Sequence, residues 1–139
     1  MSKAKMKLNN VTVQYAKQED GKSVLSASIT ADQQKAIFEK IIEEFGEDAA
    51  AEAKWIPAKG TDESGLYVKA QTSYRVAFYE DGIESDTVSS VDELGKGAVV
   101  DLFFSIGESK FRRDKGFTAY LSAVNIHKFG DLEKFNPFA

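Results

Sequence analysis

Apolar and polar residues alternate in several short stretches, and this pattern predicts a chain made mainly of β-strands. Near the N-terminus, Val11, Val13 and Tyr15 alternate with polar neighbours, which is the period of two expected for a strand with one buried face. Residues 19–22 are polar and contain a glycine, so they predict a turn. A second strand is expected in residues 24–29, and the chain therefore begins with a hairpin.

After residue 30 the spacing of apolar residues becomes that of a helix. Thr30 and Gln33 have the spacing of a capping box, with Asp32 as a competing cap. Five apolar residues then predict one buried stripe: Ile37, Phe38, Ile41, Ile42 and Phe45. Gly46 is placed to end this helix. The alanine-rich residues 49–53 predict a second helical piece.

The longest alternation covers residues 66–79 and predicts one long strand with an apolar and a mostly polar face. Tyr74 falls on the apolar face. The polar face carries two tyrosines and two cations at even spacing, so these four are expected to project to the same side: Tyr67, Lys69, Arg75 and Tyr79. Asp81 and Gly82 predict a hairpin turn, followed by a short return strand in residues 83–88.

Two further strands complete the expected sheet. In residues 99–106, one face is wholly apolar, while Asp101 and Phe103 point the other way. In residues 117–126 both faces are fairly apolar, which predicts a central or bulged strand.

This order of elements predicts a mainly β fold with one main helix (α+β). Five antiparallel strands with an inserted helix suit a small closed barrel like the oligonucleotide/oligosaccharide-binding (OB) fold. An open layer of helix on sheet is the alternative. We expect a single OB-like domain in residues 1–128 and a C-terminal tail in residues 129–139.

Composition narrows the possible chemistry. The 139 residues include 22 acidic and 18 basic side chains, which gives a net charge of −4. Because the chain has no cysteine, it has no disulfide, thiol nucleophile or cysteine-bound metal. A Ser-His-Asp triad would depend on the single histidine, His127, and no phosphate-binding glycine loop occurs. We therefore expect no enzymatic activity, no metal and no cofactor.

Neither a signal peptide nor a membrane span is evident in the sequence. The first residues lack the apolar core of a signal peptide. No apolar run approaches the roughly 20 residues that cross a bilayer. We expect a soluble, cytoplasmic protein that does not bind membranes.

The acidic net charge argues against a nucleic-acid partner only until the positions of the charges are considered. Four cations and a phenylalanine are concentrated in one expected loop, which we call the tip: Lys110, Phe111, Arg112, Arg113 and Lys115. Single-stranded nucleic acid is bound by cations that follow the phosphates and by rings on which bases stack. The tip, the polar face of residues 66–79, Phe103 and Trp55 are therefore candidate DNA-binding residues.

Each candidate has a second interpretation. Phe103 fits an interface between two copies of the chain about as well as a stacked base, and Trp55 fits packing under the helix better than exposure. Tyr and Arg on an outward strand face are also ordinary cross-strand neighbours. The alternative function is a structural or protein-interaction module, such as a virion component, that uses its sheet face for oligomer contacts.

The chain resembles the single-stranded DNA-binding proteins of lytic bacteriophages. The resemblance rests on residues 97–104 (GAVVDLFF), the tip, and residues 116–124 (GFTAYLSAV), together with the order of the earlier elements over about residues 8–128. It implies an OB barrel with an inserted helix and sequence-tolerant coating of single strands during phage DNA replication, recombination and repair.

The same resemblance implies partners. Single-stranded DNA would be the ligand, and phage or host replication proteins would be contacted in the infected cell. We also expect a homo-oligomer, with a dimer as the simplest form. Family members often end in a long acidic tail with a terminal aromatic residue. In this chain the corresponding segment, residues 131–139, is short and barely acidic. Only Phe135 and Phe138 are therefore candidates for contacts between the tail and partner proteins.

Overall fold

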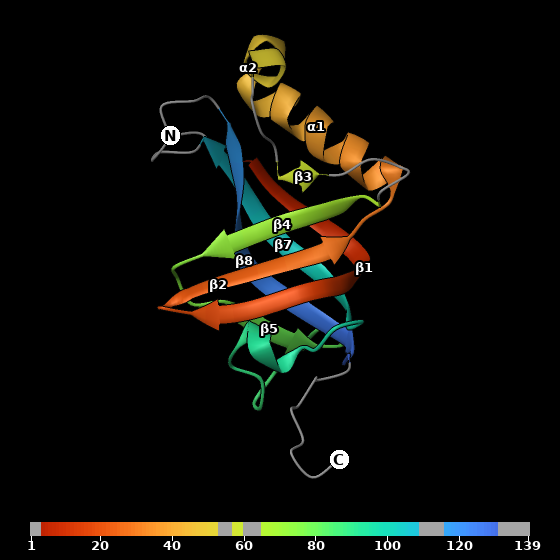
Figure 1. Cartoon of the computed structure of the whole chain (residues 1–139), viewed down its shortest axis with the longest axis vertical. Helices are drawn as coiled ribbons and strands as arrows, with labels where there is room; N and C mark the ends of the chain where they lie inside the picture. Colours follow the sequence, from red (N-terminus) through yellow and green to blue (C-terminus); the bar gives the residue numbers. More distant parts are fainter. Residues whose placement is uncertain (1–3, 53–56, 60–64, 109–115, 131–139) are drawn as a thin grey trace.

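Five strands form a closed ring in the computed structural model, which describes residues 4–52, 57–59, 65–108 and 116–130 (Figure 1). The elements are β1 (Ala4–Glu19), β2 (Lys22–Ser28), α1 (Ala31–Phe45), α2 (Glu47–Glu52), β3 (Ala58–Lys59), β4 (Tyr67–Thr72), β5 (Ala77–Glu80), β6 (Ile83–Glu84), the 3-10 helix η1 (Val91–Glu93), β7 (Val99–Glu108) and β8 (Phe117–Lys128). Around the ring the order is β4-β2-β1-β7-β8, and β8 pairs back onto β4. The predicted OB-like barrel is confirmed.

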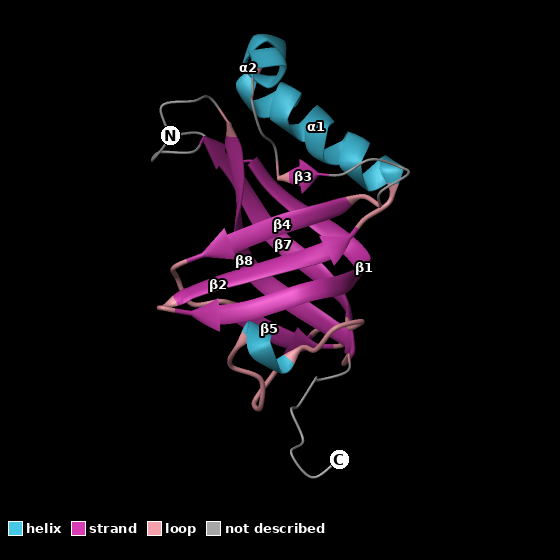
Figure 2. Ribbon diagram, in the orientation of Figure 1, coloured by secondary structure: helices cyan, strands magenta, loops and turns pink. Residues whose placement is uncertain are grey.

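One pairing in the ring differs from the expected antiparallel sheet. Ala70 and Gln71 of β4 pair in parallel with Ala119 and Tyr120 of β8, whereas the other four pairs of the ring are antiparallel. This parallel contact closes the barrel. Figure 2 shows α1 lying over one end of the barrel, so the strands keep their outer faces uncovered by it.

Local sequence signals fix the turns and the helix as expected. Asp20 and Gly21 both have positive φ, 53° and 75°, as a two-residue hairpin turn with the twist of its strands requires. Thr30 caps α1 through the predicted box with Gln33, and Asp32 lies in the first turn instead of capping. Gly46 ends the helix at a φ of 96°.

The predicted single strand over residues 66–79 is wrong, because the chain breaks at residues 73–76 into β4 and β5. Both strands pair in parallel with β8, but at different places along it. The break is stabilised by the Tyr74 N–H, which donates to Thr72 Oγ1 at 3.1 Å. As a result, the Tyr74 side chain is 83% exposed and does not face the core.

Several bulges change which side chains face the core, and two of them bear on the predicted faces. In β1 the register moves from Val13 opposite Ala27 to Tyr15 opposite Ser26. The extra residue, Gln14, turns Tyr15 outward, so the expectation that it shares a face with Val13 is wrong.

A second bulge explains why both faces of the last strand are apolar. In β8, Ser122 is the extra residue between the partners of Phe103 and Phe104. Leu121 before the bulge and Val124 after it are therefore both buried. The strand is bulged, as predicted, and it is also central, because it has partners in β4, β5 and β7.

The core fills the ring and extends beneath α1. The apolar face predicted for β7 is fully buried: Val100, Leu102, Phe104 and Ile106. Ile37 and Ile41 of α1 are also buried, and the Phe45 ring lies 4.8 Å from that of Phe117. Within the described parts of the chain, no helix combines the length and apolar character needed to cross a membrane.

Candidate nucleic-acid interface

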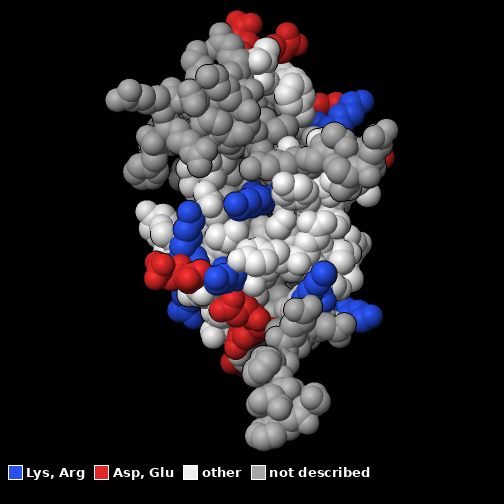
Figure 3. Space-filling model, viewed as in Figure 1, with Lys and Arg blue, Asp and Glu red and all other residues white. Residues whose placement is uncertain are grey.

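A hollow of about 640 Å³ lies on the outer face of β1, β2 and β4, and we call it the groove. Its lining combines two tyrosines, three lysines and two carboxylates: Tyr15, Lys17, Glu19, Asp20, Lys22, Val24, Ser26, Tyr67 and Lys69. Figure 3 views this side of the barrel and shows basic side chains spread over it, with acidic ones gathered towards one edge. With three lysines against two carboxylates, the lining of the groove has a slight excess of positive charge, although the chain is acidic overall.

Strand register places the rings and cations of the groove in rows. Tyr15 of β1 lies opposite Ser26 of β2, which lies opposite Lys69 of β4. Lys17 similarly shares a row with Val24. Because outward residues alternate along a strand, a ring and a cation follow each other along β1 and again along β4. This spacing provides flat surfaces for bases beside charges for phosphates.

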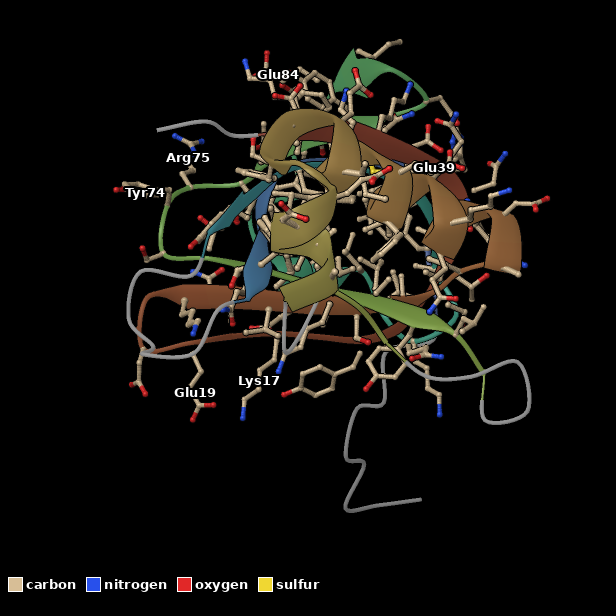
Figure 4. The ribbon with its side chains drawn as sticks, turned by 90° about the horizontal axis from the view of Figure 1, so that it is seen from above. Lys17, Glu19, Glu39, Tyr74, Arg75 and Glu84 are labelled. Atoms are coloured by element: carbon tan, nitrogen blue, oxygen red, sulfur yellow. The ribbon has the colours of Figure 1, made fainter. Side chains whose placement is uncertain are left out.

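One cation of the groove is paired within the chain. Lys17 Nζ lies 2.6 Å from Glu19 Oε2, and Figure 4 shows both side chains extending from the same side of the barrel. The hydrogen bond to Glu19 and its negative charge raise the pKa of Lys17, so the lysine stays charged. The Glu19 carboxylate therefore offsets the charge of Lys17 at this end of the groove.

The predicted site residues do not all come together. Tyr67 and Lys69 lie together in the groove. Arg75 lies in the break between β4 and β5, and Figure 4 shows it beside Tyr74, on a different side of the barrel from Lys17. The expectation that four residues of one strand project the same way is therefore wrong.

Phe103 lies on another face of the barrel, and Tyr79 lies on β5, which pairs with β8 outside the ring. Tyr79 of β5 lies opposite Asn125 of β8, and Phe103 of β7 lies opposite Ala123. Phe103 points outward, as predicted, and is 38% exposed. The remaining candidates lie outside the described residues: Trp55, Lys110, Phe111, Arg112, Arg113, Lys115, Phe135 and Phe138.

Sequence reasoning missed Tyr15, Lys17 and Lys22. Tyr15 was assigned to the core because a bulge cannot be seen in a regular alternation. One signal was nevertheless present, since Tyr15-Ala16-Lys17 repeats the Tyr-x-Lys pattern of Tyr67-Val68-Lys69. In both strands this pattern puts a ring and a cation on one face.

Away from the groove, a buried carboxylate joins three strands. Asp101 is 7% exposed, although its place in the alternation predicts an outward side chain. It accepts hydrogen bonds from the Asn10 N–H at 2.9 Å and from Asn125 Nδ2 at 3.0 Å, and His127 Nε2 lies 2.8 Å from it. Burial raises the pKa of Asp101, but these hydrogen bonds outweigh burial and lower it below its ordinary value.

The only histidine is thereby held on the outer face of β8. Its Nε2 faces Asp101, and its Nδ1 lies 3.6 Å from Asp81 Oδ1. Among the described residues, no three His, Asp or Glu side chains are grouped so that they could hold a metal ion. The hydrogen bonds that converge on Asp101 link β1, β7 and β8.

Comparisons with known proteins agree on the fold. No protein-family model and no curated protein sequence matches the chain. Among solved structures, the single-stranded DNA-binding protein of bacteriophage Enc34 in complex with single-stranded DNA has a TM-score of 0.66 at 18% identity, over 98% of this chain and 90% of that chain. A C-terminal truncation of the Enc34 protein has a TM-score of 0.67 at 21% identity, over 95% of this chain and 88% of that chain.

A protein of a second phage has the same architecture. The single-stranded DNA-binding protein gp2.5 of bacteriophage T7 has a TM-score of 0.70 at 14% identity, over 97% of this chain and 90% of that chain. At these identities the likeness concerns the fold. The chain therefore has the fold of phage single-stranded DNA-binding proteins, and the resemblance drawn from its sequence is confirmed in structure.

Proposed function

We propose that this protein is a non-enzymatic binder of single-stranded DNA that acts in phage DNA replication, recombination and repair. The observation that carries the proposal is the groove, in which Tyr15, Tyr67 and three lysines share the outer face of β1, β2 and β4. One solved structure with this fold, that of the bacteriophage Enc34 protein, contains bound single-stranded DNA, and this supports single-stranded DNA as the ligand.

In the proposed complex, lysines neutralise phosphates while bases stack on the tyrosines. Lys17, Lys22 and Lys69 supply the charges, and every base offers a flat face for stacking. Stacking and phosphate contacts carry little sequence information, so binding would tolerate any sequence. His127 of β8 faces Asp101 of β7 and Asp81 of the turn between β5 and β6, so it places no general base in the groove.

Several proposals rest on the sequence alone. The cations of the tip would add phosphate contacts, and Phe111 and Trp55 would add stacking. Phe135 and Phe138 would contact phage or host replication proteins in the infected cell, and the protein would act as a homodimer. Replacing Arg112 and Arg113 together by alanine tests the tip, because unchanged DNA affinity would exclude it from the interface.

Binding is expected to weaken steeply as salt rises. Each phosphate contact on a single strand contributes about −0.7 to the slope of log K against log salt concentration, so Lys22 and Lys69 predict a slope of about −1.4, and a contact by Lys17 in place of its pairing with Glu19 steepens the slope to about −2. Fluorescence polarisation of a labelled oligo-dT at several salt concentrations measures this slope. An absence of binding at low salt would refute the proposed function.

Replacing Glu19 by glutamine is expected to tighten binding by at most about fivefold, because the exposed ion pair that it removes is a weak interaction and the change frees Lys17 for a phosphate. The matched control is Glu39→Gln, which removes an ion pair with Lys35 on α1 and should leave affinity unchanged. In a Lys17→Ala background the gain should shrink. An equal gain in that background would mean that Glu19 acts only through overall charge.

A further inference from the structure

We propose that a second face of the barrel continues the binding path, so that a sufficiently long single strand leaves the groove across β4 and β8 and wraps onto it. The second face consists of the outward side chains Lys5, Lys7, Phe103, Ser105 and Tyr120. This inference rests on the proposed function of the groove and adds a second contact region to it.

The second face repeats the combination of rings and cations seen in the groove. Lys7 of β1 lies opposite Phe103 of β7, and Lys5 lies opposite Ser105, whose partner on β8 is Tyr120. Both lysines are exposed, and Phe103 is 38% exposed although it is a large apolar side chain. A ring and a cation therefore stand side by side on neighbouring strands.

The closure of the barrel connects the two regions. Gln71 of β4 shares a row with Lys17 and Val24 on the groove side. The same Gln71 pairs with Tyr120, which begins the row that ends at Lys5. Because neighbouring strands lie about 4.8 Å apart, the three steps from Gln71 to Lys5 span roughly 15 Å. A few nucleotides would cover this distance.

Charge favours a nucleic acid over a second copy of the chain as the occupant. A symmetric dimer places the same patch on both sides of its interface, so Lys5 and Lys7 would face their own equivalents. Phosphates instead complement these lysines. Asp101, the carboxylate on the same face of β7, is buried and hydrogen-bonded to Asn125, so it projects little towards a ligand.

The test is the length dependence of binding. OB folds bind sites of about 4–16 nucleotides, so labelled oligo-dT of about 6 and about 16 nucleotides should separate the groove from the full path. We expect Phe103→Ala to weaken binding of the longer oligonucleotide about fivefold or more and to leave the shorter one unchanged. Lys5→Ala combined with Lys7→Ala should lower the salt slope by about 1.4 for the longer one alone.

Two controls separate this inference from its alternatives. Lys35→Ala combined with Lys40→Ala removes two charges from α1 and should affect both lengths little. Thermal unfolding verifies that each variant is folded.

Three outcomes would contradict the inference. Equal effects of these variants on both oligonucleotide lengths, or no effect on either, would show that the second face does not bind DNA, while the groove still does. If Phe103→Ala abolished self-association in sedimentation without changing DNA affinity, the second face would be an interface between copies of the chain, and the inference would be overturned. Failure of the unaltered protein to bind either length would refute the proposed function itself.

Discussion

Replacing Tyr67 by alanine is expected to weaken binding of a short oligo-dT by about 5- to 160-fold, because a stacked base contributes roughly 1–3 kcal/mol. Tyr67 lines the groove on β4, two residues before Lys69, and β2 and β3 flank it on either side. It is thus a ring held on a paired strand, beside the charge that would bind the neighbouring phosphate. Fluorescence polarisation at low salt measures the change.

Two variants make this result specific. Tyr67→Phe keeps the ring and should retain most of the affinity. Tyr74→Ala removes a tyrosine that is far more exposed, 83%, but projects from the break between β4 and β5 on another side of the barrel (Figure 4). If Tyr74→Ala weakened binding of the short oligonucleotide as much as Tyr67→Ala, exposure of aromatic rings and not the groove would explain the affinity.

The parts of the fold that are encoded locally were predictable from the sequence. The turn at Asp20-Gly21 needs two residues that tolerate positive φ, and few dipeptides meet this requirement. The box of Thr30 and Gln33 depends only on residues three apart. The buried face of β7 follows from its own alternation. Each signal lies within a few residues of the structure that it determines.

The parts that depend on distant partners were not predictable. The break at residues 73–76 exists because β4 and β5 meet β8 at different points, about 50 residues further along the chain. The bulge at Gln14 is defined by a change in register against β2, and nothing in the alternation of β1 marks it. Because one extra residue reverses the faces, this single bulge moved Tyr15 from the expected core to the groove.

The candidate site shows the same division. Tyr67 and Lys69 were identified because their alternation is regular over β4. Arg75 was assigned to the same face only because the strand was assumed to continue through the break. The acidic net charge of the chain did not predict the local charge of the groove. The charges near Lys69 depend on which strands are neighbours of β4 and not on the net charge. Strand neighbours follow from the closure of the barrel.

Replacing Asp101 by alanine is expected to lower the free energy of unfolding by about 3 kcal/mol, because a hydrogen bond to a charged group contributes roughly 1.5–3 kcal/mol and several are lost together. The change leaves the Asn10 N–H, Asn125 and His127 without their shared acceptor. For a chain of this length the melting temperature should fall by about 10 °C. Thermal unfolding near pH 7 measures it, and Asp92→Ala is the matched control, because exposed Asp92 accepts a backbone hydrogen bond from Gln18.

The same variant should reveal the pH dependence that Asp101 imposes. The folded pKa of Asp101 is lower than its ordinary value near 3.8, so between the two values the unfolded chain binds more protons than the folded one. The stability from Asp101 is therefore fully present above about pH 4 and is lost as the pH falls through the lowered pKa. The difference in unfolding free energy between the unaltered protein and Asp101→Ala should shrink as the pH is lowered from about 5 towards 2. A difference that stayed constant over this range would show that the alanine acts through lost packing, and that the carboxylate charge does not join β1, β7 and β8.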